Sequence, residues 1–301
     1  MRILVTGCNG LLGQKLASLL SAKDSIKLIL TAKNALSYPT NGVEFHLLDI
    51  TSKTNVDTVV GSTQPDVIIN TAAMTQVDPC ELDQAACRNA NVTGVENLIS
   101  ASQRHSVHLI HVSTDFIFDG TRELLDESAQ PNPVNYYGAC KLEGERLVTS
   151  STISWCIIRT VLVYGVTHGA GRSNIVLWVK NSLEAGKTIQ VVSDQWRTPT
   201  LAEDLAAGCY LAALRKARGI YHISGKDFLS IYDIALRTAD YFKLDKSLIK
   251  ATNSSAFTQP GRRPLKTGFI IDKARHDLGY EPHSLDEGIA IVAGQLPVVP
   301  S

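Results

Sequence analysis

Tyr137 and Lys141 lie four residues apart in the segment Tyr137-Gly138-Ala139-Cys140-Lys141. In a helix, residues with this spacing lie on the same face. A free tyrosine titrates near ~10, but a nearby ammonium favours the phenolate and lowers that pKa. The spacing therefore predicts that Tyr137 is a proton donor tuned by Lys141. Such a phenol can protonate a carbonyl oxygen while a hydride reaches the carbonyl carbon.

Two further polar residues belong to the same candidate site. Thr114 follows an apolar run, and a hydroxyl at the carboxyl edge of a parallel sheet lies where such folds bind ligands. We expect Thr114 to hydrogen-bond the substrate carbonyl and Tyr137, and the alternative is that it only caps a turn. Asn91 lies inside a predicted helix, where asparagine is mildly unfavourable. This position indicates a hydrogen-bonding role, with simple exposure as the alternative.

The elements that position these residues alternate between short apolar runs and longer amphipathic segments. Several of the runs are apolar on both faces, which is typical of a parallel sheet covered by helices. Together the segments predict an α/β fold with a Rossmann-type doubly wound parallel sheet. We expect strands over residues 3–6, 26–31, 43–48, 67–70, 107–112 and 155–159, and helices over 53–60, 81–104 and 136–148.

The first strand runs into a turn with the glycine pattern Gly7, Gly10 and Gly13. In such turns the first glycine permits a tight bend, the second lets the backbone approach a pyrophosphate, and the third lets the helix pack close to the sheet. A strand before the turn and an amphipathic helix after it favour a dinucleotide site over an empty loop. The backbone around the turn, at Asn9, Leu11 and Leu12, is included in the predicted site.

The end of the second strand indicates which dinucleotide is bound. An acidic residue there would favour NAD, but the sequence offers Lys33, which can pair with a 2′-phosphate. NADPH is therefore the predicted cofactor, with NADH as the alternative. Asp49 is predicted to accept a hydrogen bond from the adenine amino group, and its alternative is a place at a helix N-terminus. Ile50 is assigned to the same part of the cofactor site.

Composition excludes several other classes of function. Lys plus Arg equals Asp plus Glu at 29 each, which gives no basic excess for nucleic acid or a membrane surface. No apolar stretch is long enough to span a membrane. The eight histidines show no metal-binding spacing, and the six cysteines form no C-x-x-C pair. We therefore expect a cytoplasmic enzyme with reduced thiols and no metal.

The second half is less regular. Helices are expected over residues 173–185, 201–215, 231–242 and 272–278, with a strand over 219–224. The expected division places residues 1–165 and 187–224 in an NADP-binding Rossmann domain. Residues 166–186 and 225–301 would form a smaller α/β substrate-binding lobe.

Taken together, the motifs resemble the extended short-chain dehydrogenases/reductases, and within them the dTDP-4-dehydrorhamnose reductases. The matches run in the family's order over nearly the whole chain. They are Gly7/Gly10/Gly13, Asn70-Thr71-Ala72-Ala73, Val77-Asp78 with Glu81, Asn91 with Gly94 and Asn97, Ser113-Thr114-Asp115-Phe116-Ile117-Phe118-Asp119-Gly120, Tyr137 with Lys141, Arg159-Thr160 with Val163-Tyr164-Gly165, Asp194-Gln195 with Pro199-Thr200, and Arg262-Arg263-Pro264.

The resemblance implies NADPH-dependent reduction of a 4-keto-6-deoxy sugar carried on a nucleoside diphosphate. It implies Thr114, Tyr137 and Lys141 as the catalytic trio, with a homodimer left open. It also assigns Ala72, Ala73 and Asn91 to the cofactor site. Tyr137 and Lys141 are predicted to belong to that site as well, with the Lys141 ammonium holding the nicotinamide ribose. Arginine suits a pyrophosphate because it donates two parallel hydrogen bonds. The residues implied in substrate binding are Val77, Asp115, Phe116, Leu162, Asn174, Arg262 and Arg263.

Two differences from the sequence pattern of these reductases leave other functions open. Leu162 stands where these reductases usually carry an aromatic, and Phe116 where they often carry tyrosine. The exact sugar and nucleotide therefore stay open. One alternative is another nucleotide-sugar enzyme, an epimerase or dehydratase. A second alternative is a non-catalytic NADP-binding regulatory subunit that resembles the β subunit of methionine adenosyltransferase.

Overall fold

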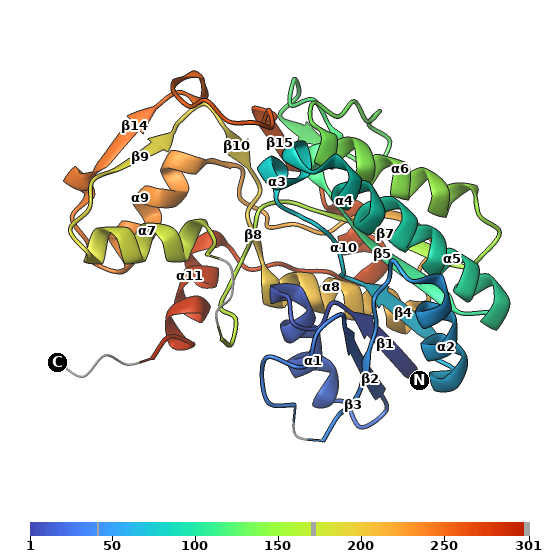
Figure 1. Ribbon diagram of the computed structural model, residues 1–301. Helices are drawn as coiled ribbons and strands as arrows, with labels where there is room; N and C mark the ends of the chain where they lie inside the picture. Colours follow the sequence, from blue (N-terminus) through green and yellow to red (C-terminus); the bar gives the residue numbers. More distant parts are fainter. Residues whose placement is uncertain (41, 170–172, 298–301) are drawn as a thin grey trace.

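The computed structural model describes residues 1–40, 42–169 and 173–297, and its largest element is a parallel sheet of seven strands (Figure 1). The strand order is β12-β7-β5-β4-β1-β2-β3, so the chain winds outward from β1 in both directions. This topology confirms the predicted doubly wound fold. The strands are β1 (Arg2–Thr6), β2 (Lys27–Ala32), β3 (Glu44–Leu47), β4 (Val67–Asn70), β5 (His108–Thr114), β7 (Trp155–Thr160) and β12 (Gly219–His222).

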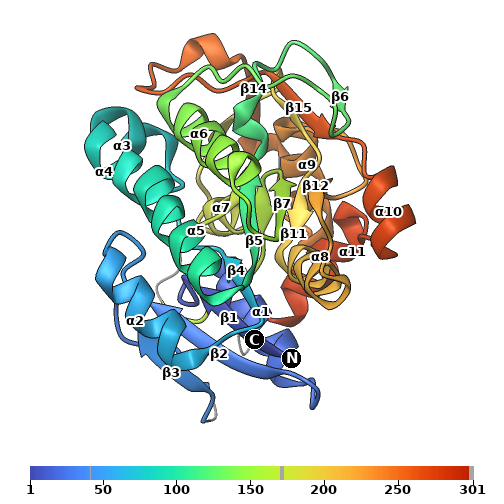
Figure 2. The ribbon, with the colours of Figure 1, turned by 90° about the vertical axis from the view of Figure 1, so that its right-hand side faces the viewer.

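Helices cover both faces of this sheet, as Figure 2 shows. One face packs on α1, α8 and α10 around an apolar cluster that includes Leu16 and Leu205. The other face packs on α2 and α5 around a second cluster, with α6 beside α5. Because both faces are covered, β4 is buried at every position. These helices are α1 (Leu11–Ser21), α2 (Lys53–Thr63), α5 (Gly94–His105), α6 (Tyr136–Ser150), α8 (Ala202–Arg215) and α10 (Asp272–Leu278).

The prediction of a single helix over residues 81–104 is wrong, because this segment forms several shorter helical pieces. These are α3 (Val77–Leu82), α4 (Gln84–Arg88), a π-helical turn (Asn89–Thr93) and then α5. Asp83 ends α3 and caps α4 by accepting a hydrogen bond from the Ala86 amide at 2.9 Å. The breaks redirect the chain so that α3 contacts the start of α6.

A smaller lobe stands beside the sheet, on the left in Figure 1. Two apolar clusters hold it together, one between α7, α9 and α11 and one beneath the parallel pair β9–β14. The helix α11 was not predicted, although Ser284 and Glu287 form a capping box at its start. The elements are α7 (Ile175–Glu184), β9 (Ile189–Val192), α9 (Ile231–Tyr241), β14 (Ile249–Thr252) and α11 (Leu285–Gly294).

Short strands join the two parts of the molecule. A four-stranded sheet has the order β13-β10-β15-β6, and a separate pair joins β8 to β11. None of these strands was predicted, because most are two residues long. Their bounds are β6 (Leu124–Leu125), β8 (Val163–Tyr164), β10 (Trp196–Arg197), β11 (Thr200–Leu201), β13 (Leu229–Ser230) and β15 (Lys266–Phe269).

The packing differs from the expected division at two places. Strand β9 pairs with β14 in the smaller lobe, although residues 187–224 were expected in the larger domain. Helix α10 packs on α8 and β12, although residues 225–301 were expected in the smaller lobe. Its residues Ala274 and Leu278 lie in the core cluster of the large sheet.

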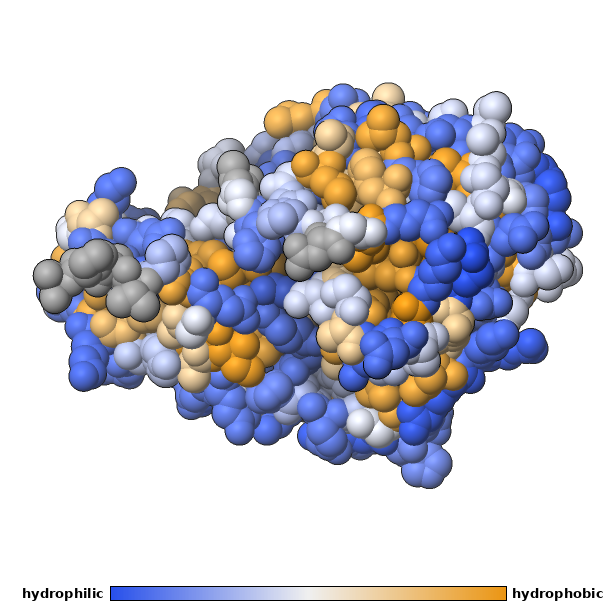
Figure 3. Space-filling view, turned by 90° about the horizontal axis from the view of Figure 1, so that it is seen from below, coloured by the Kyte–Doolittle hydropathy of each residue, from blue (hydrophilic) through white to orange (hydrophobic). Residues whose placement is uncertain are grey.

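The surface mixes hydrophobic and hydrophilic residues. Figure 3 shows the face seen from below, where hydrophobic patches lie over both lobes among hydrophilic residues. Within residues 1–40, 42–169 and 173–297, no helix is both long and apolar enough to cross a bilayer. In the same part of the chain, no group of three or more His, Cys, Asp or Glu residues is placed to hold a metal ion. The six cysteines are all buried and form no disulfide.

Candidate active site

The glycine turn lies at the carboxyl end of β1 and is too tight for side chains. Gly7 has a φ of +66°, and a Cβ there would lie 2.9 Å from the Ala72 Cα. A Cβ on Gly13 would lie 2.5 Å from the Gly7 carbonyl oxygen, so α1 packs directly against the turn. Gly10 precedes α1 and supplies no capping side chain. The first amides of α1, at Leu11 and Leu12, therefore suit a phosphate, which fits a dinucleotide.

The side chain of Asn9 shapes the loop that follows β2. Its amide donates to the Ala35 carbonyl at 2.9 Å and accepts from the Ser37 backbone at 3.0 Å. Asn9 therefore ties the loop after β2 to the glycine turn, and only its backbone belongs to that turn.

Lys33 and Asp49 come together at the carboxyl ends of two neighbouring strands, β2 and β3. Lys33 Nζ lies 2.9 Å from Asp49 Oδ2, and the Lys33 side chain is 71% exposed. Asp49 also accepts from the Thr51 amide and hydroxyl. Partial burial alone would raise the pKa of Asp49, but Lys33 and Thr51 outweigh it and lower that pKa. An exposed cation thus stands where the second strand ends, as the NADPH prediction requires.

Other residues assigned to the cofactor site lie deeper. Ile50 is 6% exposed, and its side chain would meet a Cβ on Gly94. Asn91 is 1% exposed and hydrogen-bonds the backbone of Met74 through both ends of its amide, at 3.1 and 2.9 Å. The alternative that Asn91 is simply exposed is therefore wrong. Its side chain holds the loop after β4, the same loop that carries Ala72 and Ala73.

Thr114, Tyr137 and Lys141 meet at the carboxyl end of β5. Asn135 caps α6 by accepting from the Gly138 amide at 2.8 Å, which places Tyr137 in the first turn of that helix. Tyr137 is 7% exposed and Lys141 is 2% exposed. The hydroxyl of Thr114 hydrogen-bonds Tyr137, as the sequence predicted.

The prediction that Lys141 lowers the pKa of Tyr137 is wrong for this structure. Lys141 Nζ donates instead to the Val112 carbonyl at 2.7 Å and lies 3.4 Å from His111 Nε2. Burial raises the pKa of Tyr137, against a smaller lowering from the Thr114 hydrogen bond. Burial lowers the pKa of Lys141 to about 8. The phenol is thus held in its protonated form.

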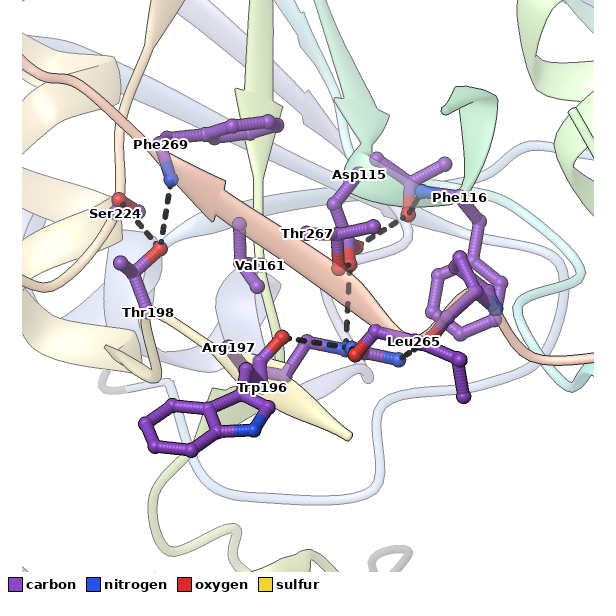
Figure 4. Close-up of polar contacts among 12 residues, drawn as sticks. Asp115, Phe116, Val161, Trp196, Arg197, Thr198, Ser224, Leu265, Thr267 and Phe269 are labelled. Carbon is purple, nitrogen blue, oxygen red and sulfur yellow. Dashed lines mark hydrogen bonds and ion pairs between the residues drawn. The ribbon is translucent and has the colours of Figure 1, made fainter. Parts of the chain in front are cut away.

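Asp115 was predicted to contact substrate, but the structure places it in a buried ion pair (Figure 4). It is 2% exposed, and its Oδ2 lies 3.6 Å from Arg197 Nε on β10 and accepts from the Thr267 hydroxyl on β15. Its Oδ1 accepts from the Thr114 hydroxyl at 3.1 Å. Burial raises the pKa of Asp115, and Arg197 opposes that rise. Asp115 therefore joins the reacting strand to the short sheet between the lobes.

Phe116 lies between this ion pair and the phenol. Its ring meets Tyr137 edge-on, with centroids 5.9 Å apart, and the Arg197 guanidinium lies 5.8 Å from its centroid. Phe116 thus forms one wall around Tyr137.

The remaining residues predicted for substrate binding fall into two groups. Leu162 and Asn174 shape the backbone: Leu162 has a φ of +38°, and Asn174 caps α7 and donates to the Gly165 carbonyl at 2.7 Å. Val77 begins α3 and would meet a Cβ on Gly261. That glycine starts the loop that carries the two predicted arginines.

Arg262 and Arg263 have different surroundings. Arg262 is exposed, and its carbonyl accepts from the Asn135 side chain at 2.7 Å. Arg263 forms a bidentate ion pair with Asp78, with distances of 2.5 Å from Nη1 to Oδ1 and 2.7 Å from Nη2 to Oδ2. The loop is therefore tied both to α3 and to the cap of the helix that carries Tyr137.

Arg263 also lines a cavity of about 180 Å³ in the smaller lobe. Two aromatic rings and several amide side chains share this lining, and none of them was predicted as a site residue, although Gln195 belongs to a matched motif. They come from α7, from β9 and from the loops before β10 and after β14, and nothing in the local sequence shows that these segments meet. The principal side chains of the lining are Trp178, Gln190, Gln195, Phe257 and Gln259.

Known proteins share this fold and sequence over nearly the whole chain. Residues 1–296 match the family model described as the RmlD substrate binding domain. A dTDP-4-dehydrorhamnose reductase of Aggregatibacter actinomycetemcomitans is 31% identical over 296 residues, which cover 93% of this chain and 94% of that protein. The β subunit of methionine adenosyltransferase 2 of Xenopus laevis is 30% identical over 254 residues, which cover 83% of this chain and 74% of that subunit.

Solved structures agree with the sequence comparisons. The crystal structure of a dTDP-4-dehydrorhamnose reductase from Bacillus anthracis strain Ames, in complex with NADP, matches with a TM-score of 0.88 at 28% identity. The match covers 98% of this chain and 99% of that one. The chain thus has the fold of the extended short-chain dehydrogenases/reductases, and it belongs to the RmlD substrate binding domain family.

Proposed function

We propose that this chain is an NADPH-dependent reductase that acts on the 4-keto group of a nucleoside-diphosphate 6-deoxysugar. The observation that carries the proposal is the meeting of Thr114 and Tyr137 at the carboxyl edge of the sheet that bears the glycine turn. Ligands of doubly wound sheets bind at this edge. The A. actinomycetemcomitans reductase supports the choice of substrate, and the NADP complex of the B. anthracis enzyme supports the choice of cofactor.

When bound, NADPH supplies the hydride, and the residues of this chain supply the proton and the positioning. Tyr137 is proposed to donate its phenolic proton to the keto oxygen. A raised pKa suits that role, since the group holds its proton at neutral pH until the oxygen becomes basic. Thr114 orients the phenol, and Lys33 pairs with the 2′-phosphate beside Asp49.

The cavity in the smaller lobe is proposed to take the nucleotide end of the substrate. Trp178 and Phe257 offer rings for stacking, and the glutamines offer hydrogen bonds to a base. Arg262 and Arg263 would face the diphosphate, with Val77, Leu162 and Asn174 shaping the walls. We propose accordingly that the larger domain binds the cofactor and the smaller lobe the sugar nucleotide, with the boundary adjusted for β9 and α10.

Turnover and one pair of variants test this proposal. NADPH oxidation is followed with dTDP-, UDP- and GDP-linked 4-keto-6-deoxy sugars. Tyr137→Phe is expected to lower turnover at least a hundredfold without weakening NADPH binding, because only the donated proton is removed. Tyr136→Phe makes the same change next along the chain and is expected to stay within threefold of the wild type. Full activity in Tyr137→Phe would contradict the proposed proton donor.

The likeness to the methionine adenosyltransferase β subunit favours one second candidate, a non-catalytic dinucleotide-binding partner protein. The contact between Thr114 and Tyr137 makes catalysis possible in this chain but does not exclude this candidate. Retained NADPH binding with no turnover on any of the three sugar nucleotides would support this second candidate over the reductase.

A further inference from the structure

A buried chain of polar side chains crosses the sheet from the glycine turn to Lys141. It runs from Thr6 at the end of β1 to Asn70 on β4, His111 on β5 and Lys141 on α6. The exposed fractions of these four side chains are 1%, 1%, 1% and 2%. Buried polar atoms need partners, so the direction of each hydrogen bond can be worked out from the next.

The direction is set at Thr6. Its hydroxyl oxygen accepts from the amides of Thr71 and Ala72, each at 3.2 Å, which occupies both lone pairs. The hydroxyl proton must therefore go to Asn70 Oδ1, which lies 2.7 Å away. Asn70 then presents its NH₂ group to His111 Nδ1 at 3.1 Å, so that Nδ1 accepts and carries no proton.

The single proton of neutral His111 must then lie on Nε2. Complete burial lowers the pKa of His111 well below its usual value, so the ring is neutral. Nε2–H points at Lys141 Nζ, 3.4 Å away. A neutral amine has a lone pair that can accept this hydrogen, whereas an ammonium has none. The amine can still donate to the Val112 carbonyl at 2.7 Å.

The other groups that face Lys141 do not account for a lowered pKa. Glu145, one turn further along α6, and the Cys87 thiol on α4 both favour the charged form. Glu145 is itself held by Arg159 on β7, with contacts of 2.7, 3.0 and 3.2 Å, which offsets its pull on the amine. Tyr137, one turn earlier, is protonated and carries no charge. Burial and the Nε2–H of His111 are therefore the two features that disfavour the Lys141 cation.

We propose that His111 is a positioning residue that stabilises the neutral form of Lys141 through Nε2–H and so lowers the pH below which Lys141 becomes a cation. Asn70 and Thr6 fix the tautomer that this requires. Because Ala72 bonds the same Thr6 hydroxyl and lies against Gly7, the chain also ties the glycine turn to the reacting residues.

The direct test is an NMR titration of Lys141 in protein labelled with ¹³C at the lysine ε carbon, where the Lys141 signal is the one lost in Lys141→Met. His111→Met removes the N–H donor and is expected to raise the titration midpoint by at least about one pH unit. His111→Gln keeps an N–H donor and should stay near the wild-type midpoint. An unchanged or lowered midpoint in His111→Met would overturn the proposal.

His108 provides a matched control on the same strand. It is also buried, but it bonds Ser154 Oγ at 2.8 Å rather than Lys141. His108→Met should leave the Lys141 midpoint unchanged, and an equal shift there would assign the effect to general loosening, against the proposal. If His111→Met fails to fold, ¹H–¹⁵N spectra of the wild-type protein read the tautomer directly. A proton on Nδ1 in place of Nε2 would overturn the inference.

The kinetic consequence rests on the proposed function. With a sugar-nucleotide substrate, the alkaline limb of the pH profile of kcat/KM should move upward in His111→Met by the same amount as the NMR midpoint. Absence of turnover in the wild type would remove the proposed function and leave the NMR result standing. A moved midpoint with an unmoved alkaline limb would show that Lys141 does not govern that limb, against the kinetic part of the proposal.

Discussion

The carboxyl edge of the large sheet and the cavity of the smaller lobe are built in different ways. At the sheet edge, Asn70, His111 and Lys141 are buried, and each contacts the next. In the smaller lobe, Trp178 and Phe257 are 37% and 39% exposed, and the lining comes from helices, from β9 and from the loop that follows β14. The first region is a rigid support for chemistry, and the second is a surface that can be altered without disturbing a core.

This difference between the two regions indicates which substitutions should affect the reaction and which should affect substrate specificity. A change in the buried chain alters several hydrogen bonds at once, whereas a change in the cavity lining alters one contact with a ligand. We therefore expect substitutions at the sheet edge to affect rate or folding, and substitutions in the smaller lobe to affect substrate affinity.

Lys141→Met offers the largest test of this contrast. Turnover should fall at least a hundredfold, because the substitution removes the amine that is predicted to hold the nicotinamide ribose in position for hydride transfer. Stability at pH 7 should instead rise, since the shift of the Lys141 pKa from 10.5 to about 8 corresponds to about 3 kcal/mol against the folded state. Urea unfolding at several pH values measures this change.

The sign of the pH dependence follows from the lowered pKa. Between about pH 8 and 10.5 the unfolded wild-type chain binds the Lys141 proton and the folded chain does not, so wild-type stability rises with pH in this window. Lys141→Met should lack that rise. A variant that loses stability at pH 7 would show that the amine supports the fold, contrary to expectation.

Arg197→Met tests the link between the two regions. It leaves Asp115 buried without its cation, which typically costs about 3–5 kcal/mol. Because burial raises the pKa of Asp115, the penalty should shrink as pH falls and the carboxyl takes up a proton. Denaturant unfolding at pH 7 and pH 5 measures both effects. Adding Asp115→Asn should restore part of the loss, and simple additivity of the two changes would argue against a coupled pair.

Arg263→Ala tests the smaller lobe. The substitution removes the ion pair with Asp78 and one cation of the cavity, so KM for the sugar nucleotide should rise about tenfold while kcat stays within threefold. Arg237→Ala on α9 breaks a surface pair with Asp286 and serves as the control. A fall in kcat with unchanged KM would assign Arg263 to the reaction. It would contradict the expectation that the smaller lobe governs substrate affinity alone.

The smallest effect is expected at Lys33. Lys33→Ala should weaken NADPH binding about fivefold and leave NADH binding unchanged, because an exposed pair contributes little. Fluorescence titrations at low and high salt measure both affinities, and the NADPH loss should shrink at high salt. An equal loss for both cofactors would remove Lys33 from recognition of the 2′-phosphate.

The sequence predicted the large sheet well because its signals are local. Strand β4 was predicted at its observed bounds, and the glycine turn was placed correctly before α1. The contact between Thr114 and Tyr137 was predicted because both residues belong to motifs that the fold brings to one edge. The strand and the turn depend on neighbours within a few residues, whereas the contact follows from the sheet edge that both motifs share.

The failures depend on contacts between distant residues. The residues near Asp115 in sequence do not indicate that Arg197 is its partner. The two residues of β10 are too few to show a strand pattern. The tuning of Tyr137 by Lys141 was predicted from spacing alone, but Val112 and His111 take up the amine. Hydrogen-bond partners supplied by another strand leave no periodic signal in the chain.

The Asn135 side-chain amide is one further link between the two regions. Asn135 accepts from the Gly138 backbone and donates to the Arg262 carbonyl, so one side chain holds both the first turn of α6 and the loop that bounds the cavity. The loop cannot be displaced without pulling on the helix end that carries the phenol. Binding of the nucleotide end of a substrate in the cavity would therefore change the position of Tyr137, near the sugar end, through the Asn135 side chain.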